Sequence, residues 1–115
     1  MIIQIFGTPK CQTTRKAERF FRERDVPFQS RDVRDKPPSK GELEKLAAAL
    51  GAAKLVGTTT KAYIDGGYAH RDFDPIEELL ERPLLLATPI VRSDSGLAVG
   101  DDPAGWKRIA DAAKV

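Results

Sequence analysis

The first fifteen residues decide the fold of this chain, and they read MIIQIFGTPKCQTTR from Met1 to Arg15. The run from Ile2 to Phe6 is β-branched and aromatic, which is typical of a short buried strand. Gly7-Thr8-Pro9 then predicts a turn, because glycine and proline interrupt regular structure. The only cysteine of the chain, Cys11, follows this turn, where we expect the first helix to begin.

The position of Cys11 favours a reactive sulfur. A helix N-terminus has N–H groups without intrahelical partners and carries partial positive charge. Both features stabilise a thiolate, which is the nucleophilic form of cysteine. Thr14 and Arg15 fall within one helical turn of Cys11 and bring a hydroxyl and a cation near it. The alternative reading is structural: a lone cysteine is often a small buried hydrophobic residue, Thr14 suits a first helical turn, and Arg15 suits an exposed helix face.

Length and composition indicate a single globular domain spanning residues 1–115. The chain is 41% hydrophobic and 31% charged, as soluble proteins are. Its formal net charge is +2, and its lysines and arginines are spread along the sequence, which argues against nucleic-acid binding. No apolar run approaches the roughly 18 residues of a membrane span, and no signal peptide is visible. One unpaired cysteine therefore predicts a reducing, cytoplasmic location, and one histidine makes a zinc site improbable.

Periodicity and capping residues predict the remaining elements, in the order strand, helix, strand, helix, helix, strand, strand, helix. The expected bounds are 2–6, 13–25, 28–33, 39–51, 74–82, 90–92, 97–99 and 103–113. The residues that we expect to cap the helices are Ser39, Gly51, Asp74 and Asp102. The stretch 52–71 has no readable pattern.

The first two strands are joined by a helix, which predicts a parallel pair. The last two strands are joined by the turn Asp94-Ser95-Gly96, which predicts an antiparallel hairpin. A mixed four-stranded sheet with helices on both faces follows, so the expected fold class is α/β.

Three stretches resemble one known family. The run from Cys11 to Arg15 resembles the Cys-x-Thr-Ser/Thr-Arg motif of the arsenate-reductase-like proteins, a family that includes ArsC, Spx and YffB. Pro83 to Val91 is similar to a second block of that family, and Gly96 to Gly100, followed by Trp106, is similar to its ending. Tyr63 is a loose match to a tyrosine-rich segment. The resemblance covers nearly the whole chain and implies a three-layer thioredoxin-like fold with a helical insertion.

The resemblance also implies a chemistry. In that family the cysteine attacks an oxidised substrate and is released by an outside thiol, such as glutathione or glutaredoxin. Cys11 would be the nucleophile, Thr14 would donate a hydrogen bond to its sulfur, and Arg15 would add positive potential. A cis peptide before Pro89 would face the sulfur. The substrate- or thiol-binding residues expected around it are Lys10, Thr13, Thr88 and Pro89.

The chain departs from the arsenate reductases at three arginines. Thr88 stands before the proline, Gly100-Asp101-Asp102 follows the last hairpin, and only Lys61 can match the third arginine. An arsenate oxyanion is best bound by bidentate guanidinium groups. At about 1.5–3 kcal/mol for each charged hydrogen bond, their loss weakens arsenate binding by several kcal/mol. Arsenate itself is therefore a doubtful substrate.

The expected function is that of a monothiol, glutathione- or glutaredoxin-dependent thiol–disulfide oxidoreductase. Thr14 stands where a resolving cysteine would be, so an outside thiol has to complete each cycle. We expect a monomer that uses glutathione as co-substrate and binds no cofactor, metal, nucleic acid or membrane. The alternative is a non-catalytic, Spx-like adaptor or regulatory protein that binds RNA polymerase. Spx-type sensors usually carry a second cysteine, which this chain lacks.

Overall fold

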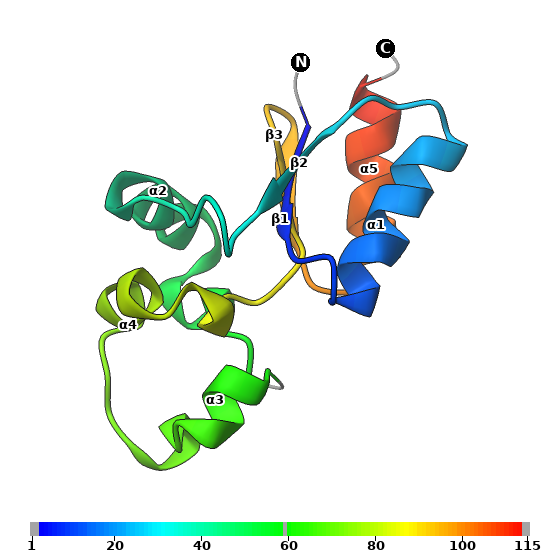
Figure 1. Ribbon diagram of the computed structural model, residues 1–115. Helices are drawn as coiled ribbons and strands as arrows, with labels where there is room; N and C mark the ends of the chain where they lie inside the picture. The colour runs from blue at the N-terminus through cyan, green and yellow to red at the C-terminus, as the bar shows by residue number, and fades with distance from the viewer. Residues whose placement is uncertain (1–2, 59, 114–115) are drawn as a thin grey trace. The chain divides into compact units, whose positions relative to one another are not determined.

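A computed structural model describes residues 3–58 and 60–113 of the chain. They divide into two compact units (Figure 1). The sheet unit contains residues 3–32 and 88–113, and the helical unit contains residues 33–58 and 60–87. The helical unit is inserted in the sequence between two strands of the sheet, as the resemblance implies. That residues 1–115 form a single domain stays a prediction.

The sheet unit is built on four strands in the spatial order β2-β1-β3-β4. Their bounds are β1 Gln4–Gly7, β2 Gln29–Asp32, β3 Ile90–Ser93 and β4 Gly96–Val99. β1 is parallel to β2 and antiparallel to β3, and β3 and β4 form an antiparallel hairpin. The predicted mixed sheet is therefore confirmed, and β2 and β4 are its edge strands.

Helices α1 (Gln12–Glu23) and α5 (Pro103–Ala113) lie side by side and close the core of the sheet unit (Figure 1). They bury Phe21 and Trp106 against Ile5 and Val91, which are opposite one another on β1 and β3. Side chains alternate along a strand, so Phe6 points to the other face of the sheet. The two helices cover one face of the sheet. That helices also cover the second face stays a prediction.

The boundaries of α1 differ slightly from the predicted 13–25. The helix begins one residue earlier, because Cys11 is its N-cap, and it ends at Glu23. The backbone N–H groups of Arg24 and Asp25 donate to carbonyls of the last turn, and Asp25 adopts the left-handed region with φ 56°. This local reversal stops the helix two residues before the predicted end.

The helical unit contains three α-helices and three short 3-10 helices within the described residues. Their bounds are α2 Lys40–Leu50, α3 Lys61–Asp65, α4 Pro75–Glu81, η1 Ala52–Leu55, η2 Tyr68–His70 and η3 Pro83–Leu85. The predicted caps are confirmed: Ser39 forms a capping box with Glu42, Gly51 ends α2, and Asp74 accepts N–H groups at the start of α4. The prediction missed α3 and the 3-10 helices.

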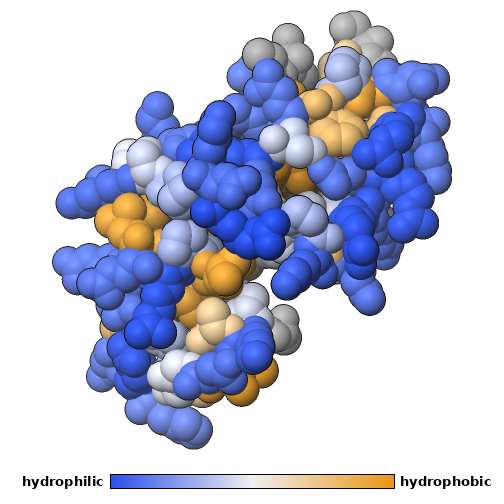
Figure 2. All heavy atoms as spheres, in the orientation of Figure 1, coloured by the Kyte–Doolittle hydropathy of each residue, from blue (hydrophilic) through white to orange (hydrophobic). Residues whose placement is uncertain are grey.

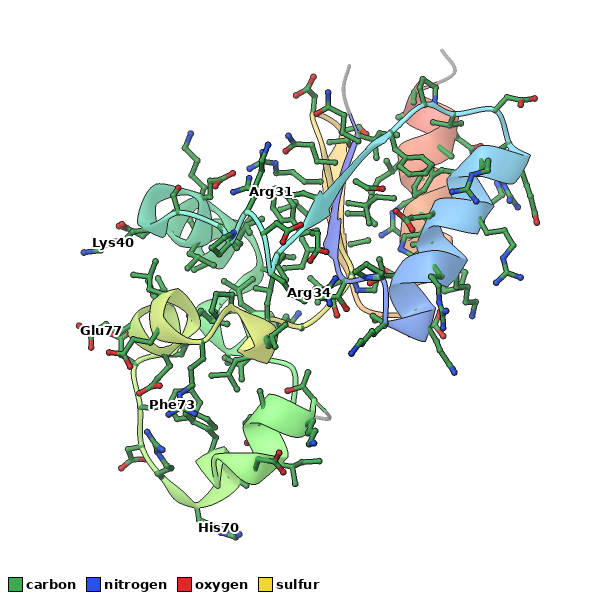
Figure 3. The ribbon with its side chains drawn as sticks, in the orientation of Figure 1. Arg31, Arg34, Lys40, His70, Phe73 and Glu77 are labelled. Atoms are coloured by element: carbon green, nitrogen blue, oxygen red, sulfur yellow. The ribbon has the colours of Figure 1, made fainter. Side chains whose placement is uncertain are left out.

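Tyr68 is the centre of an aromatic cluster in the helical unit. Its ring stacks on Tyr63 at a centroid distance of 5.9 Å and meets the edge of Phe73 at 4.9 Å. Its hydroxyl donates to Glu78 at 2.9 Å, so the buried polar atom is satisfied. Figure 3 shows Phe73 on the inner side of this region, whereas His70 points outward and is exposed.

Candidate functional site

Cys11 is half-buried at the N-cap of α1, where the sequence predicts it. Its N–H donates to the carbonyl of Thr8 at 3.1 Å, so the turn after β1 fixes the cysteine backbone. Its Sγ accepts the backbone N–H of Thr14 at 3.4 Å. The sulfur therefore caps one of the unpaired N–H groups that every helix has at its start.

Thr88 approaches the same sulfur from the segment before β3. Its Oγ1 donates to Cys11 Sγ over 3.4 Å, and Sγ lies 3.8 Å from the Thr88 carbonyl oxygen. The Thr88–Pro89 peptide is cis, which confirms the implied geometry. The carbonyl of Pro89 accepts the N–H of Gly100 at 2.9 Å, which ties this segment to the end of β4. Residues 77 positions apart thus meet at the thiol.

The surroundings of Cys11 lower the pKa of its thiol below the ordinary cysteine value. Burial raises the pKa, but hydrogen bonds from the side chains of Thr14 and Thr88 and from the backbone of Thr14 and Thr13 lower it by more. Thr14 Oγ1 is buried near the sulfur and makes no hydrogen bond of ordinary length in the described part of the chain. Because a hydroxyl rotates freely, it can turn its proton to the sulfur when that sulfur is ionised.

Arg15, Lys10 and Thr13 surround the start of α1 in different ways. Arg15 and Lys10 are exposed, and neither charge is among the causes of the lowered pKa of Cys11. Solvent screens charges in such positions, so hydrogen bonds decide the pKa. Thr13 is half-buried and contributes through its backbone. The structure therefore brings Thr14 and Thr88 directly to the sulfur, together with the backbone of Thr13.

Gly7 belongs to the site, although the sequence predicts it only as part of a turn. A Cβ added at Gly7 would overlap Cγ2 and Oγ1 of Thr14. Only glycine lets β1 approach Thr14 this closely. The two residues also line a small pocket of about 120 Å³. The other residues of this pocket are Thr8, Pro9, Glu18, Ser30, Arg31 and Asp32.

Asp101 was expected only as part of the turn that replaces an arginine loop. Its carboxylate pairs with Lys16 on the second turn of α1, at 3.0 Å. The pairing places a carboxylate beside the helix that carries Cys11 and engages one cation of that helix, Lys16. Where the arsenate reductases would supply a guanidinium group, this chain supplies negative charge.

Two further features, a metal-binding cluster and a membrane-spanning helix, are absent from the described residues. Within 3–58 and 60–113, no three or more histidine, cysteine, aspartate or glutamate side chains are grouped so that they could hold a metal ion. In the same ranges, no helix is long and apolar enough to cross a membrane.

A cysteine at the start of α1, in contact with a cis-proline segment that leads into a four-stranded mixed sheet, is the arrangement of the thioredoxin-like fold. The ArsC family model matches residues 6–109, and the chain belongs to this family. Three solved structures share the fold. The YFFB (PA3664) protein has a TM-score of 0.81 and 20% identity, and the match covers 98% of this chain and 99% of that chain. An ArsC family related protein from Bacteroides fragilis has a TM-score of 0.84 and 22% identity, with coverage of 95% of this chain and 98% of that chain. An arsenate reductase from Vibrio cholerae has a TM-score of 0.80 and 21% identity, with the same coverage of 95% and 98%.

Two curated relatives carry the name of a transcriptional regulator. The chain is 27% identical over 107 residues to the global transcriptional regulator Spx of Enterococcus faecalis, and the match covers 86% of this chain and 79% of the relative. The corresponding protein of Listeria innocua is 26% identical over 107 residues with the same coverage. The family thus includes both arsenate reductases and transcriptional regulators among proteins similar to this chain.

Proposed function

We propose that this protein is a monothiol thiol–disulfide oxidoreductase that depends on glutathione or glutaredoxin. The observation that carries the proposal is the sulfur of Cys11, which accepts hydrogen bonds from Thr14 N–H and Thr88 Oγ1 and whose thiol pKa is lowered by them. These donors stabilise the thiolate, and the thiolate is the attacking species in disulfide exchange. The proposal includes a cytoplasmic monomer that works on an oxidised thiol of another molecule.

The reaction has two balanced steps. First, the Cys11 thiolate attacks the glutathione sulfur of a glutathionylated substrate. A new S–S bond forms, the old one breaks, and the substrate sulfur leaves as a thiolate that takes up a proton. Second, a glutathione or glutaredoxin thiolate attacks the glutathione sulfur of this mixed disulfide, which forms glutathione disulfide or glutathionylated glutaredoxin and releases the Cys11 thiolate. Thr14 and Thr88 would hold the ionised sulfur both before attack and after release.

Arsenate is a poor candidate substrate under this proposal. Thr88 reaches the sulfur with a hydroxyl instead of a guanidinium group, and Asp101 adds a carboxylate beside α1. A doubly charged oxyanion needs cationic bidentate partners, and within the described chain the sulfur of Cys11 contacts only Thr14 and Thr88, which are neutral. We expect negligible arsenate reduction with glutathione and glutaredoxin, and robust turnover would contradict this.

The test is the pH dependence of Cys11 alkylation by the neutral reagent iodoacetamide. We expect a midpoint below the ordinary cysteine pKa of about 8.5, and a midpoint at or above it would overturn the proposal. Cys11→Ser is the control and should incorporate no label, since Cys11 is the only cysteine. In a second assay, Cys11 is first converted to its mixed disulfide with glutathione. Glutaredoxin should then remove the glutathione from Cys11 at a rate that depends on glutaredoxin concentration.

The regulators among the relatives favour a second candidate, a regulatory binding protein without turnover. The two candidates differ in what they need from the sulfur. A binding protein would capture the same partner with Cys11→Ser as with the natural chain, because its surface is unchanged. An oxidoreductase loses all exchange activity in the same variant.

A further inference from the structure

Helix α1 carries an uneven charge. Between Gln12 and Glu23 it has four cations and two carboxylates, so this one helix holds as much net charge as the +2 of the whole chain. Lys10 adds another cation just before the helix. The rest of the sequence therefore sums to a net charge of zero, and three of the four cations of α1, namely Arg15, Lys16 and Arg19, lie in its part nearest Cys11.

The cations form a stripe on the outer side of α1. Gln12, Arg15, Lys16 and Arg19 line one groove of about 570 Å³, which we call the basic stripe. Their spacing of three and four residues places them on one helix face. The stripe begins one residue after Cys11 and, at 1.5 Å per residue, runs about 10 Å along the helix. The surface over this side of α1 is hydrophilic, on the right of Figure 2.

Two arginines of the basic stripe are unpaired. Lys16 binds Asp101, whereas Arg15 and Arg19 are exposed and make no ion pair with any described residue. Glu18, the carboxylate nearest in sequence, accepts a hydrogen bond from Ser30 on β2 instead. The charge of the two guanidinium groups is therefore available to another molecule.

This arrangement works against the stability of the helix. The first turn of α1 has no acidic residue, although the positive end of the helix dipole favours one. Arg15 and Arg19 are like charges four residues apart, a spacing at which they repel. A surface selected for solubility alone mixes both signs. An unmixed basic face beside the nucleophile is better explained by binding.

We infer that the basic stripe docks an acidic polypeptide segment of the protein whose cysteine carries the mixed disulfide that Cys11 attacks. This inference rests on the proposed function and names the class of its substrate: proteins with carboxylates close to the oxidised cysteine. The guanidinium fork pairs with a carboxylate through two hydrogen bonds. Carboxylates two residues apart on an extended segment, or four apart on a helix, match the spacing of Arg15 and Arg19. Opposite charge also speeds encounter and orients the partner.

The experiment uses three synthetic peptides with one cysteine each, carried as a mixed disulfide with 2-thiopyridine. The residues that flank the cysteine are glutamates, serines or lysines. The rate of thiopyridone release reports the attack by Cys11. With the natural protein we expect the acidic peptide to react about tenfold faster than the basic one at low ionic strength, and the difference to shrink as salt is added.

Arg19→Glu should remove the preference or reverse it, because it replaces one of the two unpaired guanidinium groups of the stripe with a carboxylate, two turns from the sulfur. Arg108→Glu is the matched control: it makes the same charge change at an exposed residue of α5 that has no ion pair in the described chain, and it should keep the preference. The pH midpoint of Cys11 alkylation by iodoacetamide is also measured for every variant. An unchanged midpoint shows that a changed rate comes from docking and not from a change in the thiol pKa.

Equal rates for the three peptides, or a preference that survives Arg19→Glu, would overturn the docking inference and leave the proposed function standing. Absence of thiopyridone release from every peptide, with the protein folded by circular dichroism, would overturn the proposed function itself. The two failures are therefore distinguishable in one set of measurements.

Discussion

The sheet unit and the helical unit use the same residue types for different ends. In the sheet unit, Thr88 directs its hydroxyl to a sulfur that has few other partners. In the helical unit, Thr60 directs its hydroxyl to the backbone: it donates to the Gly57 carbonyl at 2.8 Å and accepts the N–H of Tyr63 at 3.1 Å. One threonine tunes a reactive group and the other closes a short helix. The partner of a side chain, rather than its type, separates the functional region from the structural one.

The glycines of the two units differ in the same way. Gly7 in β1 leaves room for Thr14, which contacts the sulfur through its backbone. Gly41 in α2 has only Ser39 Oγ near an added Cβ, at 4.0 Å, which is an ordinary contact distance. The first glycine is required by close packing at the site, whereas the second is a weak point of a helix. Identical substitutions in the two units should therefore have opposite effects.

The largest effect is expected from this pair of glycines. Gly7→Ala should lower the free energy of unfolding by about 1–3 kcal/mol, because the new methyl group displaces Thr14 from a tightly packed position. It should also raise the midpoint of Cys11 alkylation. Gly41→Ala should raise the free energy of unfolding by about 0.5–1 kcal/mol, because alanine favours a helix, and should leave the midpoint unchanged. Urea unfolding and iodoacetamide titration measure both quantities.

Either of two results would contradict the glycine comparison. An unchanged alkylation midpoint in folded Gly7→Ala would mean that the approach of β1 to Thr14 does not support the thiolate. Destabilisation by Gly41→Ala would mean that α2 does not have the open surface described above.

A smaller effect is expected from the pair of threonines. Thr88→Val keeps the shape of the side chain and removes the donor to Cys11 Sγ, so alkylation at neutral pH should slow about fivefold for a hydrogen bond worth about 1 kcal/mol. Thr60→Val removes the cap of α3 and should cost about 1 kcal/mol of stability without changing the alkylation rate. The sharpest contradiction would be a Thr60→Val protein with slowed alkylation, since the hydrogen-bond partners of the sulfur among the described residues lie in the sheet unit.

The sheet unit could be predicted from the sequence because its signals are local. A β-branched run, the turn Gly7-Thr8-Pro9 and a helical periodicity after it indicate β1 and α1 without reference to the rest of the chain. The cis peptide before Pro89 came from family resemblance, since no local pattern distinguishes a cis from a trans bond. The contact between Thr88 and Cys11 spans 77 positions, which periodicity alone could not have indicated.

The helical unit between residues 52 and 71 could not be predicted, because α3 and η2 are only 5 and 3 residues long. Elements of this length show no full hydrophobic period, and they depend on contacts such as Tyr68 with Glu78. The basic stripe was missed for a different reason. Cations at intervals of three and four look evenly spread in a sequence, but they gather on one face when the helix forms.

The smallest effect concerns pH and stability, and it separates the sulfur from the rest of the protein. The pKa of Cys11 is lower in the folded protein than in the unfolded chain, where it is about 8.5. A lowered thiol pKa contributes stability that is fully present above the unfolded value and is lost as pH falls through the folded value. The difference in free energy of unfolding between the natural protein and Cys11→Ser should therefore increase with pH between these two pKa values and then level off.

Solvent limits this contribution to less than about 1 kcal/mol, because the sulfur is only half-buried. Parallel urea titrations of both proteins from acidic pH to above the unfolded pKa, in the presence of a reductant, would measure it. The subtraction cancels every other titrating group, including those of the helical unit, since both proteins share them. A difference that stays constant with pH would mean that Thr14 and Thr88 hold the neutral thiol as well as the thiolate, and the donors around Cys11 would then belong with the structural hydrogen bonds of Thr60.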